Sequence, residues 1–124
     1  MERYASINLS NPRQPGLNPI PASAIADTKS AHLCIPHHLA LQLQLTSQGQ
    51  RETTFPNGTK GFVDYVGPVK IEFNGRTGYA GGLVMGKECL VGHIVMAELD
   101  LVVAPETKRL KVNPKSPNIA TSKA

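Results

Sequence analysis

Apolar and polar residues alternate along several short segments of the chain, which is the pattern of a strand with one buried face. Residues 4–9 alternate in this way, and residues 20–26 and 31–35 are mostly small or apolar. The stretches between them, residues 11–16 and 27–30, are rich in Pro, Gly or polar side chains that favour loops. The first third of the chain is therefore predicted to contain three strands joined by two loops.

Two Asn-Gly pairs mark the turns of two predicted hairpins, because both residue types accept positive φ. The first hairpin joins residues 51–55 to residues 61–66, and its turn consists of Pro56, Asn57, Gly58 and Thr59. The second joins residues 69–73 to residues 77–85 through Asn74 and Gly75. Two hairpins in succession indicate an all-β fold.

Two short helices are expected within this β framework. Pro36 presets its own φ and suits the start of a helix, so residues 36–43 are predicted to be helical. The regular spacing of four leucines leaves a strand open as an alternative; they are Leu39, Leu41, Leu43 and Leu45. A second helix is expected at residues 93–98, after a short apolar strand and before strands at residues 101–103 and 110–112.

The length and composition fit one small globular domain. A chain of 124 residues supports a single core, and its 11 Gly and 10 Pro agree with many tight turns. The domain is predicted to span residues 1–113. Residues 114–124 contain few bulky apolar side chains and are predicted to form a disordered tail.

The net charge, the aromatic content and the lack of long apolar runs narrow the classes of partner that are expected. The net charge is +4, but the basic residues are scattered and only 5% of the residues are aromatic, so no nucleic-acid partner is expected. No apolar run approaches the roughly 18 residues that cross a bilayer, so no membrane contact is expected. The first ten residues do not have the pattern of a secretory signal, which predicts a cytoplasmic protein.

Asp27 is the candidate for chemistry. It is the only charged residue between Arg13 and Lys29, and it lies where an apolar strand turns into a polar loop. One interpretation is structural, because Asp and Thr in loops often bond to nearby backbone groups. The other is catalytic, and it depends on the residues around Asp27.

Residues 25–31, Ile-Ala-Asp-Thr-Lys-Ser-Ala, resemble the Asp-Thr-Gly-Ala/Ser catalytic loop of aspartic proteases. Further similarities follow in the family's order: the turn at Pro56–Gly61 resembles the tip of the flap, and residues 65–73 resemble the long strand that descends from it. Leu90, Val91 and Gly92 resemble the hydrophobic-hydrophobic-Gly motif that packs beneath the catalytic loop. Over residues 4–113 the chain resembles the bacterial single-domain, retropepsin-like (clan AA) aspartic proteases.

This resemblance implies a closed, barrel-like sheet with a flap hairpin, and an aspartic endopeptidase that needs no metal or other cofactor. Each chain offers one catalytic loop, so the resemblance implies a homodimer in which two Asp27 carboxylates activate a water to hydrolyse a peptide or protein substrate. Thr28 would then hydrogen-bond across the dimer, Ser30 would bond the outer oxygen of Asp27, and the turn at Asn57-Gly58 would close over the peptide.

Lys29 departs from the family pattern, which has Gly at this position. A Lys side chain adds bulk and a positive charge beside the two carboxylates, and the charge opposes the state in which they share one proton. If instead its long stem reaches solvent, the loop still works. The alternative function is therefore a catalytically silent homodimer that binds peptides, and a small regulatory β protein of the antitoxin type is a further one.

A metal site is the remaining chemical alternative. Its candidate ligands are His32, Cys34, His37, His38 and His93. Their spacing matches neither a zinc finger nor a His-Glu-x-x-His helix, so no metal is predicted. Cys34 and Cys89 are expected to be small buried hydrophobic residues. The glycines at 78, 81 and 82 are interpreted as strand glycines that allow close packing or a bulge, and not as a phosphate loop.

Overall fold

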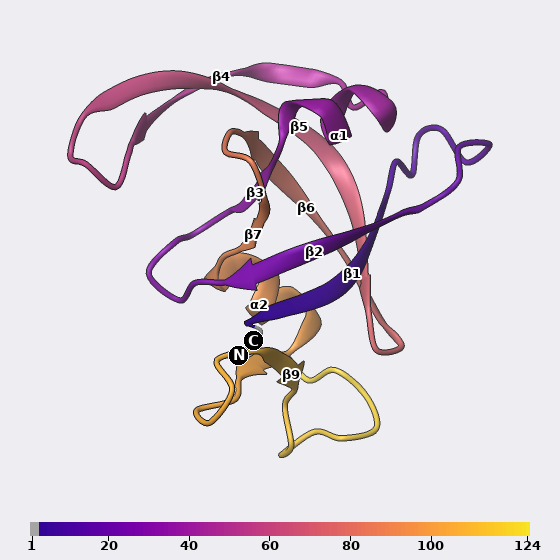
Figure 1. The fold of residues 1–124 in the computed structure, drawn as a ribbon. Coiled ribbons are helices and arrows are strands. Elements are labelled where there is room, and N and C mark those ends of the chain that lie inside the picture. Colours follow the sequence, from indigo (N-terminus) through magenta and orange to yellow (C-terminus); the bar gives the residue numbers. More distant parts are fainter. Residues whose placement is uncertain (1–2) are drawn as a thin grey trace.

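A computed structural model describes residues 3–124, and most of them fold around one small barrel (Figure 1). The strands in this range are β1 Tyr4–Ser10, β2 Ile20–Ala26, β3 Leu33–Ile35, β4 Ser47–Thr54, β5 Lys60–Phe73, β6 Arg76–Val84, β7 Cys89–Val91, β8 Leu101–Val103 and β9 Leu110–Val112. The two helices are α1 His37–Gln42 and α2 His93–Leu99. The predicted all-β class is confirmed.

The barrel closes through one extra strand pairing. Strands follow the order β1-β2-β7-β3-β6-β5-β4 in the sheet, and β1 also pairs with β5, so six strands form a closed ring. β4 remains outside this ring and pairs only with β5. Figure 1 shows β4 and the start of β5 crossing above the barrel, with their connecting turn bending down toward the side of the loop after β2. The resemblance predicted this barrel-like sheet and its projecting hairpin, and both are confirmed.

The barrel interior follows from the alternation seen in the sequence. In β1 the buried positions are Ala5, Ile7 and Leu9, and the residues between them are exposed. Val95 and Leu99 of α2 are fully buried in the same hydrophobic cluster. Burial of each large aliphatic side chain contributes about 1.5–3 kcal/mol to folding, so this cluster holds the helix against the sheet.

The two predicted hairpins use different turns. Asn74 and Gly75 both have positive φ, 46° and 82°, and connect Phe73 directly to Arg76, as expected for a two-residue hairpin. In the β4–β5 turn only Gly58 has positive φ, at 86°, so the expectation of positive φ at Asn57 is wrong. Pro56 provides the reason, because its fixed φ places it second in a turn closed by the hydrogen bond from Gly58 N–H to the Phe55 carbonyl at 2.9 Å.

Two element boundaries differ from the sequence expectation. The strand predicted at residues 31–35 is confined to β3, because the Ala31 carbonyl accepts a hydrogen bond from the N–H of Ile94 in α2 at 2.9 Å. Residues 61–66 and 69–73 form one continuous strand, β5, with a register shift between Val66 and Val69. The helix predicted near Pro36 is present as α1, with Pro36 as its N-cap, so the strand alternative is excluded.

Residues after β9 lie against the end of α2. The carboxylate of Asp100 accepts hydrogen bonds from the Asn113 side chain (3.0 Å), the Thr121 N–H (2.9 Å) and the Ser116 hydroxyl. Arg76 also lies close, with one guanidinium nitrogen 3.6 Å from Asp100 Oδ2. The structure thus gives defined contacts to part of the segment that the sequence predicts to be a disordered tail.

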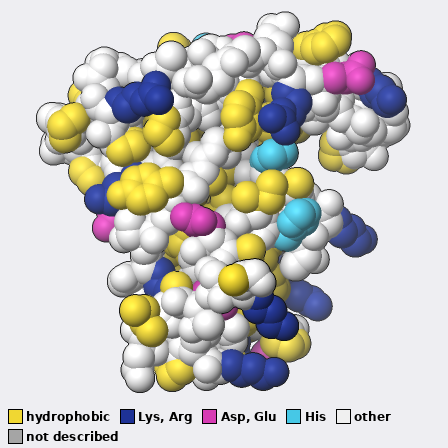
Figure 2. All heavy atoms as spheres, turned by 180° about the vertical axis from the view of Figure 1, so that it is seen from behind, with side chains coloured by type: hydrophobic (Ala, Val, Ile, Leu, Met, Phe, Trp, Pro, Cys, Tyr) yellow, Lys and Arg dark blue, Asp and Glu magenta, His cyan; other side chains and the backbone are white. Residues whose placement is uncertain are grey.

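The surface of the described residues shows no long apolar element. No helix among residues 3–124 is long and apolar enough to span a membrane. Figure 2 shows Lys and Arg side chains at several separate places from the top to the bottom of the face that it draws. The basic residues are therefore distributed over that face.

Candidate active site

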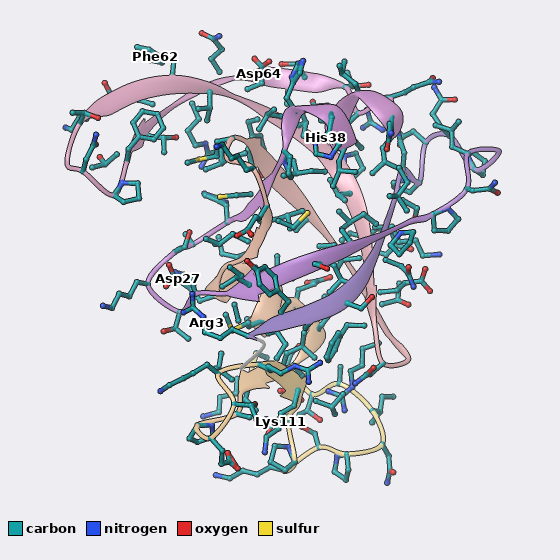
Figure 3. All side chains as sticks on the ribbon, viewed as in Figure 1. Arg3, Asp27, His38, Phe62, Asp64 and Lys111 are labelled. Carbon is teal, nitrogen blue, oxygen red and sulfur yellow. The ribbon has the colours of Figure 1, made fainter. Side chains whose placement is uncertain are left out.

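Asp27 begins the loop that follows β2. The last residue of β2, Ala26, pairs in parallel with Val91 of β7, and the N–H of Asp27 donates to the Val91 carbonyl at 3.0 Å. The parallel pairing ends at this point, so the chain leaves the sheet with Asp27 as its first loop residue. Figure 3 shows Asp27 on this loop at the side of the barrel.

The loop is closed by hydrogen bonds to Asp27 itself. Its Oδ1 accepts the N–H of Lys29 at 2.9 Å, and its carbonyl accepts the N–H of Ser30 at 3.2 Å. The structural interpretation of Asp27 is therefore confirmed, since its side chain accepts a hydrogen bond from the backbone of its own loop. It does not exclude chemistry, because Oδ2 accepts no hydrogen bond from residues 3–124. The bond that the resemblance implied from Ser30 to the outer oxygen of Asp27 is therefore not formed in the structure.

Gly92 supports this loop from beneath. A Cβ atom at Gly92 would lie 2.5 Å from the carbonyl carbon of Ala31 and 2.6 Å from its oxygen, which is too close for any other residue. Directly after Gly92, the N–H of His93 donates to the Ser30 carbonyl at 2.8 Å. The start of α2 and the loop around Asp27 are thus in backbone contact, which requires a residue without a side chain at position 92.

Leu90 and Val91 face opposite sides of β7. Val91 is fully buried in the barrel core, and Leu90 is half-buried beside the loop. Leu90 and Gly92 therefore lie next to the loop that carries Asp27, and Val91 lies in the core.

A cleft of about 660 Å³ lies between this loop and the β4–β5 hairpin. Its lining combines the loop and β3, the hairpin, and two neighbouring strand ends. The residues are Asp27, Lys29, Ser30, Ala31, His32, Cys34, Arg51, Glu52, Thr53, Thr54, Phe55, Pro56, Leu83, Met85 and Leu90. The structure thus brings Asp27, Lys29, Ser30, Pro56 and Leu90 to one cavity. Thr28, Asn57, Gly58 and Thr59 do not line it.

Comparison with known proteins supports the same architecture. No family model matches the sequence, and no curated protein matches it. The EIAV protease complexed with the inhibitor HBY-793 matches with a TM-score of 0.56 at 18% identity, over 81% of this chain and 89% of that chain. The retroviral protease-like domain of Ddi1 from Leishmania major matches with a TM-score of 0.58 at 9% identity, over 92% of this chain and 91% of that chain. The fold is retropepsin-like. At these identities the matches establish the fold alone.

Within the retropepsin-like barrel, the loop residues after Asp27 face outward. Thr28 and Lys29 are exposed, and the Thr28 hydroxyl makes no hydrogen bond within residues 3–124. Lys29 forms no salt bridge within the same range, although it follows Asp27 by only two positions. The hydrogen bond that the resemblance gives Thr28 across a dimer stays a prediction.

A cluster that the sequence did not reveal lies on the hairpin side of the cleft. Arg51 of β4 donates from Nη1 to Nε2 of His32 at 3.2 Å, and its guanidinium carbon lies 4.5 Å from the ring centroid of Tyr65 in β5. The His32 and Tyr65 rings meet edge to face, with centroids 5.9 Å apart. These three residues are not linked by any regular spacing in the sequence. They meet because β4 pairs with β5, β5 with β6, and β6 with β3.

His32 is held in its neutral form by this environment. Burial of the ring lowers the pKa of His32, and the nearby charges of Arg51 and then His93 lower it further. Arg51 has no lone pair to offer, so Nε2 of His32 must be the acceptor and the ring proton is on Nδ1. His32 therefore bonds to an arginine and is not a free metal ligand.

The other candidate metal ligands do not converge either. Within residues 3–124, no group of three or more His, Cys, Asp or Glu side chains is placed to hold a metal ion. His37 and His38 are exposed on α1.

Both cysteines are buried and unpaired, as expected for small hydrophobic residues. Burial raises the pKa of Cys89 to about 11, and burial followed by the charge of Asp27 raises that of Cys34. Both thiols are therefore protonated near neutral pH and are poor nucleophiles. Cys34 contributes an apolar wall to the cleft rather than a reactive group.

Proposed function

We propose that the chain is one subunit of an aspartic endopeptidase whose active site forms when two copies bring their Asp27 side chains together. The observation that carries this proposal is the position of Asp27. It lies in a cleft between its loop and a projecting hairpin, with Oδ1 fixed by the Lys29 N–H and Oδ2 uncommitted.

The second carboxylate is assigned to a symmetry-related copy. Glu52 is the only other acidic residue in the cleft lining, and it belongs to the hairpin rather than to a rigid loop. A twofold axis through the loop would place the same rigid group on both sides of a peptide, which is an isologous contact. The exposed Thr28 then lies at the contact between the two loops.

The chemistry follows from two carboxyl groups that cannot both ionise. The ionised Asp27 of one protomer takes a proton from a water molecule while the water oxygen bonds to the scissile carbonyl carbon. The protonated Asp27 of the partner subunit donates a hydrogen bond to the carbonyl oxygen. Collapse of the tetrahedral intermediate breaks the C–N bond, and the leaving nitrogen receives a proton from a carboxyl group.

Lys29 favours a second candidate function, a dimer that binds peptides without cleaving them. Its ammonium group is attached two residues from Asp27 and is not neutralised by a salt bridge within the described chain. A positive charge close to the two carboxylates stabilises their ionised forms and so opposes the state in which they share one proton. The fold and the peptide cleft are the same in both candidates.

Three proteins distinguish the two candidates: wild type, Asp27→Asn and Lys29→Gly. Each is incubated with an unfolded protein substrate between about pH 4 and pH 7, and cleavage is followed by mass spectrometry. For the endopeptidase we expect cleavage by the wild type and a loss of roughly 10²-fold or more in Asp27→Asn. Cleavage only by Lys29→Gly identifies a protease silenced by its lysine, and no cleavage by any of the three contradicts the endopeptidase proposal.

A further inference from the structure

We propose that Arg51 forms a subsite for an acidic side chain of the bound peptide, so that the cleft selects substrates with Glu or Asp at one fixed position. This inference rests on the proposed function, because it names the substrate class of that same cleft. Arg51 lines the cleft together with Asp27 and is exposed to it.

The charge of Arg51 has no acidic partner within residues 3–124. Residues 3–124 contain one salt bridge, between Arg76 and Asp100, and Arg51 takes no part in it. The acidic groups of the cleft lining are Asp27, which the proposed reaction uses, and Glu52, which is adjacent to Arg51 on β4. Successive side chains of a strand point to opposite sides, so Glu52 is not directed at the Arg51 guanidinium.

The Arg51 guanidinium is held in one orientation. Its central carbon lies over the Tyr65 ring, 4.5 Å from the ring centroid, and one N–H donates to Nε2 of His32. A guanidinium carries five N–H donors, so four remain, and a carboxylate uses two of them in a paired arrangement. An arginine fixed in advance loses little side-chain freedom when it binds an anion.

Tyr65 itself is fixed from below. A Cβ atom at Gly81 would lie 2.1 Å from the Tyr65 hydroxyl oxygen and 2.2 Å from the adjoining ring carbon. The Tyr65 ring therefore rests on the bare backbone of β6, which explains one of the strand glycines. The platform for Arg51 is part of the barrel wall and not of the turn that ends the hairpin.

The positive charge of the cluster remains on Arg51 alone near neutral pH. The groups that face His32 are Arg51 from β4, Tyr65 from β5 and His93 from α2, and none of them is an anion that would favour a charged imidazole. His32 is thus a neutral acceptor that orients Arg51 without competing for a carboxylate. This arrangement leaves a single oriented cation in the wall of the cleft.

The test measures binding in the Asp27→Asn background, where cleavage does not interfere. A set of acetylated, amidated peptides carries Glu, Gln or Lys in turn at each position of one sequence, and affinities are measured by fluorescence anisotropy. We expect one position at which Glu binds roughly five- to tenfold more tightly than Gln, as a charge-assisted bond at a partly exposed site gives. The preference should weaken as salt is raised.

Substitution of Arg51 assigns the preference to its source. Arg51→Gln should bind the Glu and Gln peptides equally, and Arg51→Glu should favour the Lys peptide at the same position. Lys87→Gln is the matched control, because it removes an exposed positive charge that does not line the cleft, and it should keep the Glu preference. Thermal melts of each variant verify that it is folded.

Several outcomes overturn the inference. Equal binding of Glu and Gln peptides by the protein that keeps Arg51 overturns this inference and leaves the proposed function untouched. A Glu preference that survives in Arg51→Gln does the same. No binding of any peptide would overturn the proposed function together with this inference.

Discussion

Gly92 shows how one residue without a side chain can determine the position of a loop that carries a candidate catalytic group. Its Cα lies so close to Ala31 that the loop bearing Asp27 rests on the backbone at the start of α2. The atoms that an added methyl group would meet belong to the main chain, which cannot rotate away as a side chain could. The geometry of the loop therefore depends on position 92 more than on any single hydrogen bond within it.

Gly92→Ala should destabilise the protein by about 1–3 kcal/mol, the usual cost of overpacking a tight interior contact. The free energy of unfolding is measured by urea denaturation. Gly16→Ala is the control, because a Cβ atom there meets nothing within 4 Å and should leave stability almost unchanged. Equal effects of the two substitutions would contradict the close contact at Ala31.

Residue-level reasoning from the sequence succeeded where the chemistry is local. Asp27 could be singled out because it is an isolated charge after an apolar strand, and Asn74-Gly75 because both residues accept positive φ. The Arg51–His32–Tyr65 cluster could not be found in this way. Its members lie on β4, β5 and the approach to β3, and only the pairing of strands β4, β5, β6 and β3 decides that they meet.

At the level of elements, the segment after β9 is tied to the end of α2 through one carboxylate. The hydrogen bonds of Ser116, Asn113 and Thr121, in that order of effect, lower the pKa of Asp100 to about 2. These contacts are not predictable from the sequence, because Pro, Ser and Lys residues are typical of disordered tails as well as of ordered turns. What orders the segment is a set of partners supplied by a distant helix end.

The lowered pKa of Asp100 makes a pH-dependent contribution to stability. Its pKa in the folded protein lies below the ordinary value of 3.8, so the stabilisation is complete above about pH 4 and is lost as the pH falls toward 2. We expect wild type to melt above Asp100→Asn at neutral pH, and the difference in Tm to shrink between about pH 4 and pH 2.

The control for Asp100 is Glu106→Gln, which removes an exposed carboxylate that makes no hydrogen bond within the described chain. Its melting temperature should follow that of wild type at every pH. A difference between wild type and Asp100→Asn that stays constant down to pH 2 would show that the carboxylate is not bonded as described.

At the level of the whole molecule, the proposed activity belongs to a pair of chains. If both Asp27 carboxylates are required, an equal mixture of wild type and Asp27→Asn contains only about one quarter wild-type dimers after subunit exchange. Activity at fixed total protein should then fall to about a quarter of the wild-type value. A fall to only one half would show that each chain acts alone.

The architecture was accessible to sequence analysis because several weak signals occur in one order along the chain. The loop at Asp27, the turn after Phe55, the long strand and Leu90-Val91-Gly92 are each common, but a retropepsin-like barrel places all of them at defined positions. The pairing of two copies stays a prediction, because the loop residues proposed to make it, Thr28 among them, are exposed in the single chain.

Because β4 lies outside the closed ring, the strand that lines the cleft is separate from the strands that form the core. None of its residues is buried, and in the sheet it pairs only with β5, so the closed barrel does not depend on the side chains of β4. Arg51 and the other β4 residues that line the cleft are thus free to vary without loss of the core. Natural or laboratory evolution can therefore retune what the cleft accepts by exchanging this one strand, while the scaffold that keeps Asp27 in place is inherited unchanged.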